Sequence, residues 1–539
     1  MADFYPADVG RSIIASGGLG IITAYTNGTT VAVEIKQPFP VTAFNSGDWA
    51  ILGTPNATCT PSGKDPVGTT ITLTLGAAGW RDDDVGKYVQ INGGLCKITV
   101  KTSDTVVSAR IEKELTATVT APAFAWTLEG AAWGGNYGWP RCGTLFEQRL
   151  WTAGSRGFPQ SMWGSVIGDY LDFTIGTLDD DALNIIIASG ELNPIMHIAN
   201  ARGMVALTSG GEFSIQGGQQ KAITPTNISV KDQSNYGISQ VAPARVGQEI
   251  FFVQRAGRKV RALSPNQYDD GQYVSPDVSV LAEHVTESGI ASMAYQPEPD
   301  ALLYVVRNDG AMATLTCDRD QDVFAWSRQS TQGAFESVEV VPTANGNNVF
   351  VIVARAVGGA IVRFVEMFDA TMLTDCAITG HSGAGAVTWG GLSHLIGRTV
   401  QAKGDGVYLG EFVVNGSGQI TLPRAAYDVE IGLGYVTAIK TLTPEFMAPT
   451  GSSQGHQLSI REVKVRLLKT IGCAVNLQDI AFRKLGAGVL DAAPAMFTGD
   501  KIAGNLQWGN GVGQTLIQQT LPYPFHLLAV ITKLTANEG

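Results

Sequence analysis

The stretch VAPARVGQEIFFVQRAGRKVRAL, residues 241–263, determines how the rest of the chain is interpreted. Its apolar runs at 250–253 and 260–263 are short, rich in β-branched and aromatic residues, and separated by the turn Ala256-Gly257-Arg258. Runs of this kind between glycine-containing turns predict a β-hairpin. Similar units recur about every 50 residues, a spacing that is typical of a β-propeller or a comparable array.

The composition supports a large β-rich protein. A chain of 539 residues is too long for one simple core, so we expect two to four domains. Hydrophobic residues make up 44% and charged residues 16%, and the 64 glycines are more than average usage predicts. Because the glycines are spread through the sequence, they indicate many turns and not a linker. We therefore expect an all-β fold, with a β-propeller-like core and appended and inserted small β domains.

The net charge of −11 bears on possible partners. A protein that grips nucleic acid needs many Lys and Arg residues to neutralise phosphates, so this balance argues against general nucleic-acid binding. It leaves open a channel through which DNA passes without being held.

The cysteines and the start of the chain bear on the compartment. The six cysteines are scattered and no pair has the spacing of a zinc or redox motif, so we expect reduced thiols in a protein that folds in a cytosol. Asp3 and Pro6 interrupt any apolar run at the start, so no signal peptide is expected. The longest apolar runs are far short of the ~20 residues of a membrane helix.

The N-terminal region contains an internal repeat. Asp8-Val9-Gly10-Arg11 corresponds to Asp84-Val85-Gly86-Lys87, and Gly17-Gly18-Leu19 corresponds to Gly93-Gly94-Leu95. Further matches follow at the same offset of 76 positions, with no gap. We predict that residues 1–50 and 80–125 fold as two copies of one small unit, each with three strands. Three strands need a surface on which to bury their apolar face, either the other copy or a neighbouring subunit.

The remaining chain divides by pattern. Asn308-Asp309-Gly310 between apolar runs is a good hairpin signal. The strand at 462–467 alternates charged and apolar side chains, as a half-buried strand does. A single short helix is expected near residues 277–284, and strands near 525–533 are candidates for closing a sixth blade. The expected domains are a small β repeat at 1–50, a loop and second repeat at 51–133, propeller blades at 134–370, an inserted small β domain at 371–445, and C-terminal strands completing the propeller at 446–539.

The motifs that suggest chemistry are weak. Gly380-His381-Ser382-Gly383-Ala384 resembles a nucleophile elbow, but Ala384 stands where the pattern requires Gly. The acidic run 318–322 lacks the Gly and Glu that a calcium loop needs. The runs 82–84 and 179–181 consist of adjacent acids. On a strand their side chains would alternate in direction, so the carboxylates could not all point to one site. The six histidines form no pair at ligand spacing. We expect no catalytic residues, no metal site and no cofactor.

The strongest local charge feature is the tip and return strand of the opening hairpin, which carries Arg255, Arg258, Lys259 and Arg261. An ordinary solvated turn is one interpretation. The other is an electrostatic contact with an acidic neighbour or with DNA phosphate. We treat these four residues as candidates for a contact between subunits.

Several segments are distinctive in combination. They are CGTLFEQRLWTAGSRGFPQSMWGSVIGDYLDF at 142–173, DDDA at 179–182, TSGGE at 208–212, ITPTN at 223–227, FFVQRAGRKVRAL at 251–263, LAEH at 281–284, YQPEPD at 295–300, 318–326, and FTGDK at 497–501. Together they resemble one protein family, the tail nozzle or tail tubular protein B-like proteins of short-tailed bacteriophages. The resemblance covers most of the chain from residue 139 onward and is strongest between 139 and 370. Members of the family often carry further sequence before the first Asp-Val-Gly repeat, whereas this chain begins almost at it.

The resemblance implies a non-enzymatic component of the virion tail, made and assembled in the host cytoplasm. Six copies would form a ring that joins the tail adaptor protein and tail fibres, faces the host envelope at the tail tip, and lets viral DNA leave through its centre. It also implies a β-propeller with appended β domains. Two alternatives remain: a receptor- or glycan-binding tail protein with a propeller fold, and a propeller enzyme acting on cell-wall sugar, which would need two carboxylates across a cleft.

Overall fold

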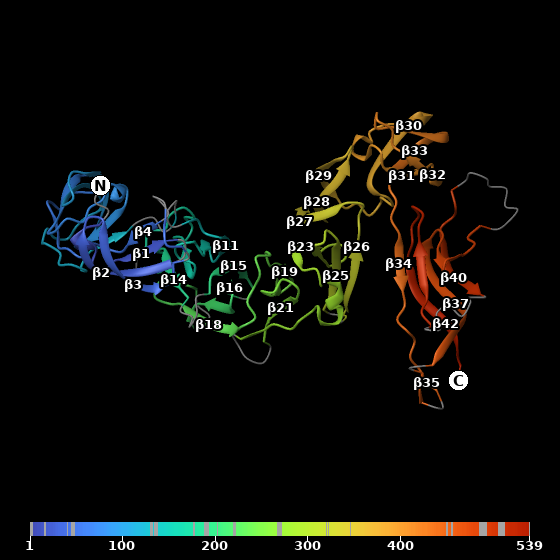
Figure 1. Cartoon of the computed structure of the whole chain (residues 1–539), viewed down its shortest axis with the longest axis horizontal. Coiled ribbons are helices and arrows are strands. Elements are labelled where there is room, and N and C mark those ends of the chain that lie inside the picture. Colours follow the sequence, from blue (N-terminus) through green and yellow to red (C-terminus); the bar gives the residue numbers. More distant parts are fainter. Residues whose placement is uncertain are drawn as a thin grey trace. The chain divides into compact units, whose positions relative to one another are not determined.

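The regular structure consists of β-strands and short 3₁₀ helices, with no α-helix among the described residues of the computed structural model (Figure 1). The chain forms two compact units, the first comprising 1–256 and 260–277 and the second 257–259 and 278–539. The described residues are 4–15, 18–39, 41–44, 49–129, 133, 138–175, 178–187, 193–201, 203–218, 222–266, 272–319, 321, 323–344, 346–448, 451–453, 456–483, 493–504 and 513–537. Gly17, Asp320 and Asp322, which belong to motifs named in the sequence analysis, lie outside them.

The first unit begins with the two repeated elements, here called the first and second modules. In the first module the sheet order is β3-β2-β1-β4, and in the second it is β10-β7-β8-β9-β6-β5. The first module comprises η1 (Pro6–Asp8), β1 (Ser12–Ala15), β2 (Gly18–Asn27), β3 (Thr30–Gln37) and β4 (Trp49–Leu52). The second comprises β5 (Cys59–Pro61), β6 (Thr70–Leu75), η2 (Asp82–Asp84), β7 (Tyr88–Ile91), β8 (Gly94–Lys101), β9 (Val106–Lys113) and β10 (Thr127–Glu129).

The two modules share one strand register, which confirms the predicted repeat. Ser12 pairs with Ile21 in the first module, and Tyr88 pairs with Lys97 at the same places in the second. The irregularity in the β2–β3 ladder after Ile22 also recurs after Ile98 in β8–β9. The offset seen in the sequence therefore extends to individual strand pairs and bulges.

A glycine in the left-handed region connects the helix and hairpin of each module. Gly10 has φ +94° and donates its N–H to the carbonyl of Ile22 at 2.7 Å. Gly86 has φ +93° and donates to the carbonyl of Ile98 at 2.9 Å. Only glycine adopts this conformation without a steric cost, so the Val-Gly step of the repeat is a requirement of the turn.

One packing contact differs between the modules. A Cβ added to Gly20 in β2 would lie 2.3 Å from Cγ1 of Val33 in β3. At the equivalent positions the second module has Cys96 and Ala109, both fully buried. The larger side chain is thus on β3 in the first module and on β8 in the second.

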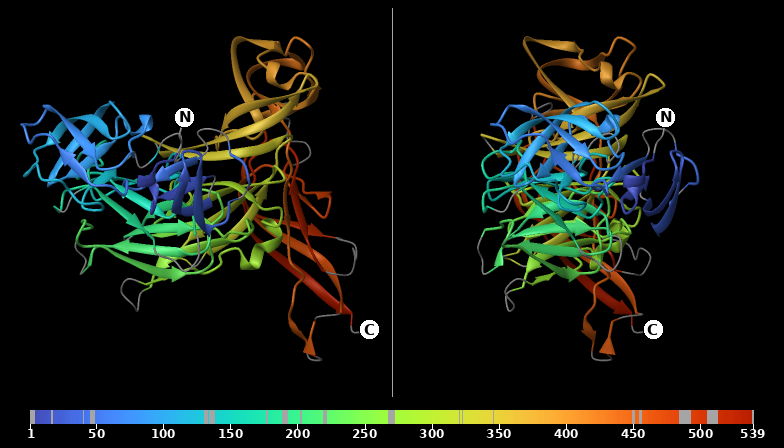
Figure 2. Two further views of the ribbon diagram at one scale, coloured as in Figure 1. Left: turned by 60° about the vertical axis from the view of Figure 1, so that its left-hand side comes forward. Right: turned by 90° about the vertical axis from the view of Figure 1, so that its left-hand side faces the viewer.

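Five antiparallel meanders follow, three in the first unit and two in the second (Figures 1 and 2). Each has its strands in sequential order, four in the first four sheets and three in the fifth, which is the organisation of propeller blades. The chain is therefore all-β, with a propeller-like core. The blades are β11 (Cys142–Phe146), β12 (Arg149–Ala153), β13 (Ser161–Gly164), β14 (Leu183–Ile186); β15 (Ile195–Asn200), β16 (Met204–Thr208), β17 (Glu212–Gln216), β18 (Ser229–Ser234); β19 (Ala244–Val246), β20 (Glu249–Val253), β21 (Val260–Pro265), β22 (Tyr273–Val274); β23 (Ile290–Gln296), β24 (Leu302–Arg307), β25 (Met312–Asp318), β26 (Val323–Gln329); and β27 (Ala334–Thr343), β28 (Gly346–Val357), β29 (Ala360–Met367).

The predicted hairpins lie within these blades. β20 and β21 pair through Val253 and Val260, as the opening stretch indicated. Gly310, with φ +80°, forms the turn between β24 and β25. The expected short helix is the 3₁₀ helix η4 (Val280–Val285).

The inserted domain forms a sheet of its own, in the order β30-β33-β31-β32 (orange in Figure 2). It contains a third instance of the module turn: Gly397, with φ +77°, donates to the carbonyl of Val414 at 2.9 Å, and Val414 donates back to Arg398 at 3.0 Å. Its elements are β30 (Asp375–Trp389), η5 (Ser393–Leu395), β31 (Thr399–Gly404), β32 (Val407–Val413) and β33 (Ile420–Leu433).

The C-terminal strands, which were predicted to complete the propeller, form sheets of their own. The long strand β37 is the centre of one sheet and pairs with β42 on one side and β40 on the other (red in Figure 1). Among the described residues none of these strands pairs with β11–β29. These elements are β34 (Thr437–Lys440), β35 (Met447–Ala448), β36 (Gly451–Ser452), β37 (Gln457–Thr470), β38 (Ala474–Val475), β39 (Gln478–Asp479), β40 (Phe497–Gly504), β41 (Leu516–Gln519) and β42 (Leu527–Asn537).

Candidate functional site

The four basic residues of the β20–β21 hairpin have different surroundings. Arg255 and Arg258 are exposed. Lys259 is partly exposed, and its Nζ forms an ion pair with Glu283 at 2.8 Å. Exposed pairs of this kind contribute little to stability.

Arg261 has an intrachain role that the sequence did not indicate. Its guanidinium carbon lies 3.5 Å from the ring centroid of Tyr236. Its Nε donates to Gln254 at 2.9 Å and an Nη to the carbonyl of Ser275 at 2.6 Å. These contacts satisfy the guanidinium within its own blade. Among the four candidates for a subunit contact, Arg255, Arg258 and Lys259 are the accessible ones.

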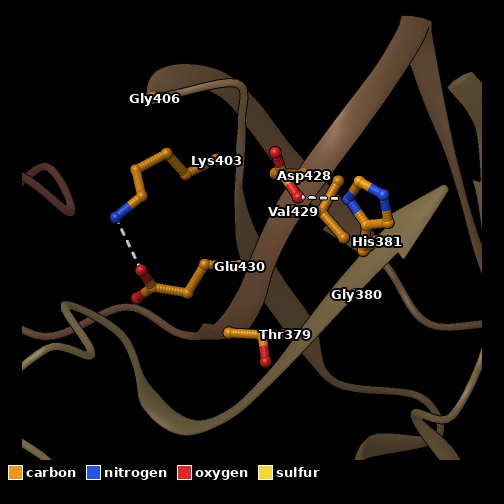
Figure 3. Close-up of a pocket in the computed structure, with 8 residues that line it drawn as sticks. All are labelled: Thr379, Gly380, His381, Lys403, Gly406, Asp428, Val429 and Glu430. Atoms are coloured by element: carbon orange, nitrogen blue, oxygen red, sulfur yellow. Dashed lines mark hydrogen bonds and ion pairs between the residues drawn. The ribbon is translucent and has the colours of Figure 1, made fainter. Parts of the chain in front are cut away.

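A pocket of about 410 Å³ lies on the inserted domain (Figure 3). His381 on β30 and Asp428 on β33 form one pair on its wall, with Nδ1 2.6 Å from Oδ1. Lys403 on β31 and Glu430 on β33 form a second, at 2.6 Å. The lining residues are Thr379, Gly380, His381, Lys403, Gly406, Asp428, Val429 and Glu430.

The two pairs have different physical character. His381 and Asp428 are about 70% exposed, so water screens their attraction. Glu430 is almost fully buried and also accepts hydrogen bonds from the N–H of Leu373 at 2.6 Å and the hydroxyl of Thr374 at 3.0 Å. A carboxylate with this many donors is held in place and has a structural role.

The elbow-like motif does not place its serine in the pocket. Ser382 follows His381 on β30 and is not among the lining residues, in agreement with the alternation of side chains along a strand. Asp428 and Glu430 are two residues apart on β33, so they share one strand face, and each pairs with a different base, His381 and Lys403.

The acidic clusters have structural partners. Asp84 is fully buried and pairs with Lys87 at 2.7 Å, as Asp8 pairs with Arg11 at 2.8 Å. The turn at 179–181 presents its carbonyls to the fully buried Arg149, which donates to Asp179 at 2.6 Å. Within the described part of the chain, no group of three or more His, Cys, Asp or Glu residues could hold a metal ion.

An ion cluster around the buried Arg355 joins the fifth blade to the inserted domain, and no local sequence pattern indicates it. Arg355 on β28 donates twice to Glu366 on β29, at 2.6 Å each, and lies 3.3 Å from Asp375 at the start of β30. Burial disfavours the charged form of Arg355, but the bonded Glu366 and nearby Asp375 outweigh it and raise the pKa of the guanidinium. Arg355 and Asp375 are 20 positions apart in the sequence, so no short sequence pattern connects them.

A buried carboxyl group lies in the second blade. Glu212 on β17 has no exposed surface, and the hydroxyl of Ser234 on β18 donates to it. Burial raises the pKa of Glu212 to about 7, although its hydrogen bonds and nearby Arg261 oppose the shift. This group therefore changes protonation near neutral pH.

Comparisons with known proteins give similarity only to solved structures. No protein-family model matches the chain, and no curated protein is significantly similar. The solved structures include an auxiliary nutrient binding protein from Bacteroides thetaiotaomicron, 9% identical with a TM-score of 0.26, over 69% of this chain and 97% of that one. The Cps50 (Swd1) β-propeller domain of Myceliophteria thermophila is 11% identical with a TM-score of 0.27, over 58% and 89%.

A third, the Pan2 WD40 domain of Neurospora crassa, is 9% identical with a TM-score of 0.22, over 55% of this chain and 82% of that one. Similarity this low carries no argument about function. The propeller-like organisation is based on the sheet topology of the chain itself. Among the described helices, none has the length and apolar character needed to span a membrane.

Proposed function

We propose that this chain is a structural protein of a short phage tail, and that its copies form the nozzle ring through which viral DNA leaves. The contacts of Arg149 carry the proposal. This fully buried guanidinium donates to the carbonyls of Ser165 at 2.6 Å and Asp181 at 2.7 Å. It thereby joins two of the segments that resemble nozzle proteins, 142–173 and 179–182. The residues behind the resemblance thus form part of the packed framework of the first blade.

The charge supports a conduit. Each copy carries −11, so a ring of six would carry about −66. A wall rich in Lys and Arg would gain affinity at every phosphate through counterion release, whereas a negative wall repels the duplex and lets it slide. In this proposal the pore surface is net acidic, and Arg255, Arg258 and Lys259 face a neighbouring copy or the outer surface. The ring would also contact an adaptor protein and tail fibres.

The alternative of a glycan-binding tail protein receives less support. Sugar sites commonly place an aromatic ring beside convergent polar groups. The pocket of the inserted domain has the polar groups, but no Phe, Tyr or Trp is among its lining residues.

The test is the assembly state of the purified full chain together with its binding to duplex DNA. Mass photometry and electron microscopy should show a ring that encloses a pore. Fluorescence anisotropy should show weak DNA binding at low and at moderate salt. A chain that stays monomeric at every concentration, or tight binding with a steep salt dependence, would contradict the proposal.

A further inference from the structure

The first module has an open edge where the second module is closed. In the first, β3 is the last strand of its sheet, and among the described residues it pairs only with β2. In the second, the equivalent strand β9 continues into β6 and β5. Ile71 and Leu73 of β6 lie opposite Ala109 and Val107 of β9 in antiparallel register.

The burial of matched side chains shows the effect of the covering strand. Val107 and Ile111 of β9 have no exposed surface. At the equivalent positions of β3, Val31 is only partly buried and Ile35 is 62% exposed. The two hairpins are otherwise alike, and β2 and β8 share the same order of buried and exposed residues over their first eight positions. The exposed apolar residues of β3 therefore mark a missing strand and not a different fold.

The third instance of the module turn continues differently and gives no comparison for this edge. The strand that follows its hairpin, β33, pairs with β31, the first strand of the hairpin. In the first and second modules the third strand pairs instead with the second strand of the hairpin. The comparison for the outer edge of β3 is therefore the second module.

We propose that a neighbouring copy of this chain adds a β-strand to the outer edge of β3 and completes the first module. The inference rests on the proposed ring, which brings copies side by side. An unpaired edge offers a row of backbone N–H and C=O groups to an incoming strand, and the side chains of that strand fill alternate positions. The strand β6 shows what fits this place: it alternates threonine with Ile71, Leu73 and Leu75.

The charges at the edge agree with an uncharged incoming strand. Glu34 and Lys36 on β3 pair with each other at 2.5 Å, and Arg110 and Glu112 form the same pair, with reversed sign, on β9. The strand β6, which covers β9, carries no charge. The incoming strand therefore places apolar side chains opposite Val31 and Val33 and neutral polar side chains between them.

The test uses the full chain with Ile35→Lys. A lysine on an edge strand hinders strand addition, and Ile35 is exposed enough for the substitution to leave the monomer folded. Val119→Lys is the matched control, because Val119 is 69% exposed and lies outside β3. We expect about tenfold weaker association for Ile35→Lys in concentration-dependent mass photometry and unchanged association for Val119→Lys.

Hydrogen exchange of the β3 amides separates the outcomes. In the assembled wild type they should exchange more slowly than in the monomer. A ring whose β3 amides exchange at the monomer rate, or whose Ile35→Lys variant assembles normally, overturns this inference and leaves the proposed function standing. A wild-type chain that never assembles overturns both. If the β3 amides are already protected in the monomer, the covering strand comes from the same chain. If they are protected only when a different protein is added, the strand comes from that protein. Either result also overturns the proposal.

Discussion

Arg81 of the second module forms an ion pair with Asp8 of the first, and the side chain of Asp8 has no exposed surface. Arg81 occupies the place that Tyr5 has in the first module, and its guanidinium also lies 5.1 Å from the Tyr5 ring centroid. The backbone N–H of Asn56 adds a bond to the carbonyl of Ala7 at 2.7 Å. The two copies therefore pack on each other through the helical turn that begins the first module.

Replacing Arg81 with alanine should separate these modules. Asp8 keeps Arg11 as a partner, so we expect a loss of about 2 kcal/mol in the unfolding free energy and not the full cost of an unpaired buried charge. Chemical denaturation of the full chain measures it. Arg110→Ala is the control, because the Arg110–Glu112 pair is half exposed and should contribute nothing measurable. Equal effects of the two substitutions would contradict this assignment.

The ion cluster of the fifth blade gives a second prediction. Arg355→Ala leaves Glu366 and Asp375 without their cation, and because these carboxylates are 19% and 24% exposed we expect a cost of about 3 kcal/mol, the lower end for a broken buried pair. We expect a lower melting temperature and faster hydrogen exchange in β28 and β29. Arg363→Ala is the control: Arg363 pairs with Glu336 on the same sheet, but its side chain is 65% exposed. The prediction is wrong if the Arg355→Ala variant has the same melting temperature as the wild type.

Glu212 predicts a pH dependence. Its pKa is about 7 in the folded protein and 4.5 as an ordinary side chain, so the folded state binds the extra proton between these values. The contribution of Glu212 to the unfolding free energy should be fully present below about pH 4.5. It should be lost as pH rises through 7, a decrease on the order of 3 kcal/mol. Glu212→Gln, which is neutral at every pH, should flatten this slope. A slope that persists in the variant would assign it to another group.

The cysteines give a fourth prediction. All six are free, and burial raises the pKa of Cys59 to about 12 and of Cys96 and Cys473 to about 11. A rise from 9 to about 11 reduces the reactive thiolate about 100-fold, so iodoacetamide should label the native protein slowly at pH 8. Mass spectrometry after labelling in denaturant, with no reductant, should count six thiols. A smaller count would reveal a disulfide.

The repeat and the hairpins could be predicted because their signals are local. Gly10 and Gly86 are required by a positive φ, and Asp309-Gly310 forms the turn of a two-strand hairpin. The third instance of the module turn was missed in the sequence. The segment Ile396-Gly397-Arg398 resembles Val85-Gly86-Lys87, but Leu395 stands where the first two copies have a buried aspartate. Arg398 instead donates to the carbonyls of Ala356 and Gln332.

The candidate site was harder to predict because its contacts join residues that are far apart in the sequence. His381 and Asp428 are 47 positions apart and meet only because β30 pairs with β33. Arg261 was grouped with its exposed neighbours by sequence, but the alternation of side chains on β21 directs it to Tyr236. No local sequence pattern distinguishes a charged residue that forms contacts within its own chain from one that contacts another subunit.

The different side-chain sizes at positions 20 and 33, and at the equivalent positions 96 and 109, couple the two strands of each hairpin. A change of Gly20 to alanine would bring its Cβ to 2.3 Å from Cγ1 of Val33, so one of the two strands or the valine side chain would have to shift. A smaller residue at position 33 would relieve this crowding. Substitutions at these two positions are therefore expected to be non-additive, and a hairpin built from one strand of each copy would be a poorer fit than either original.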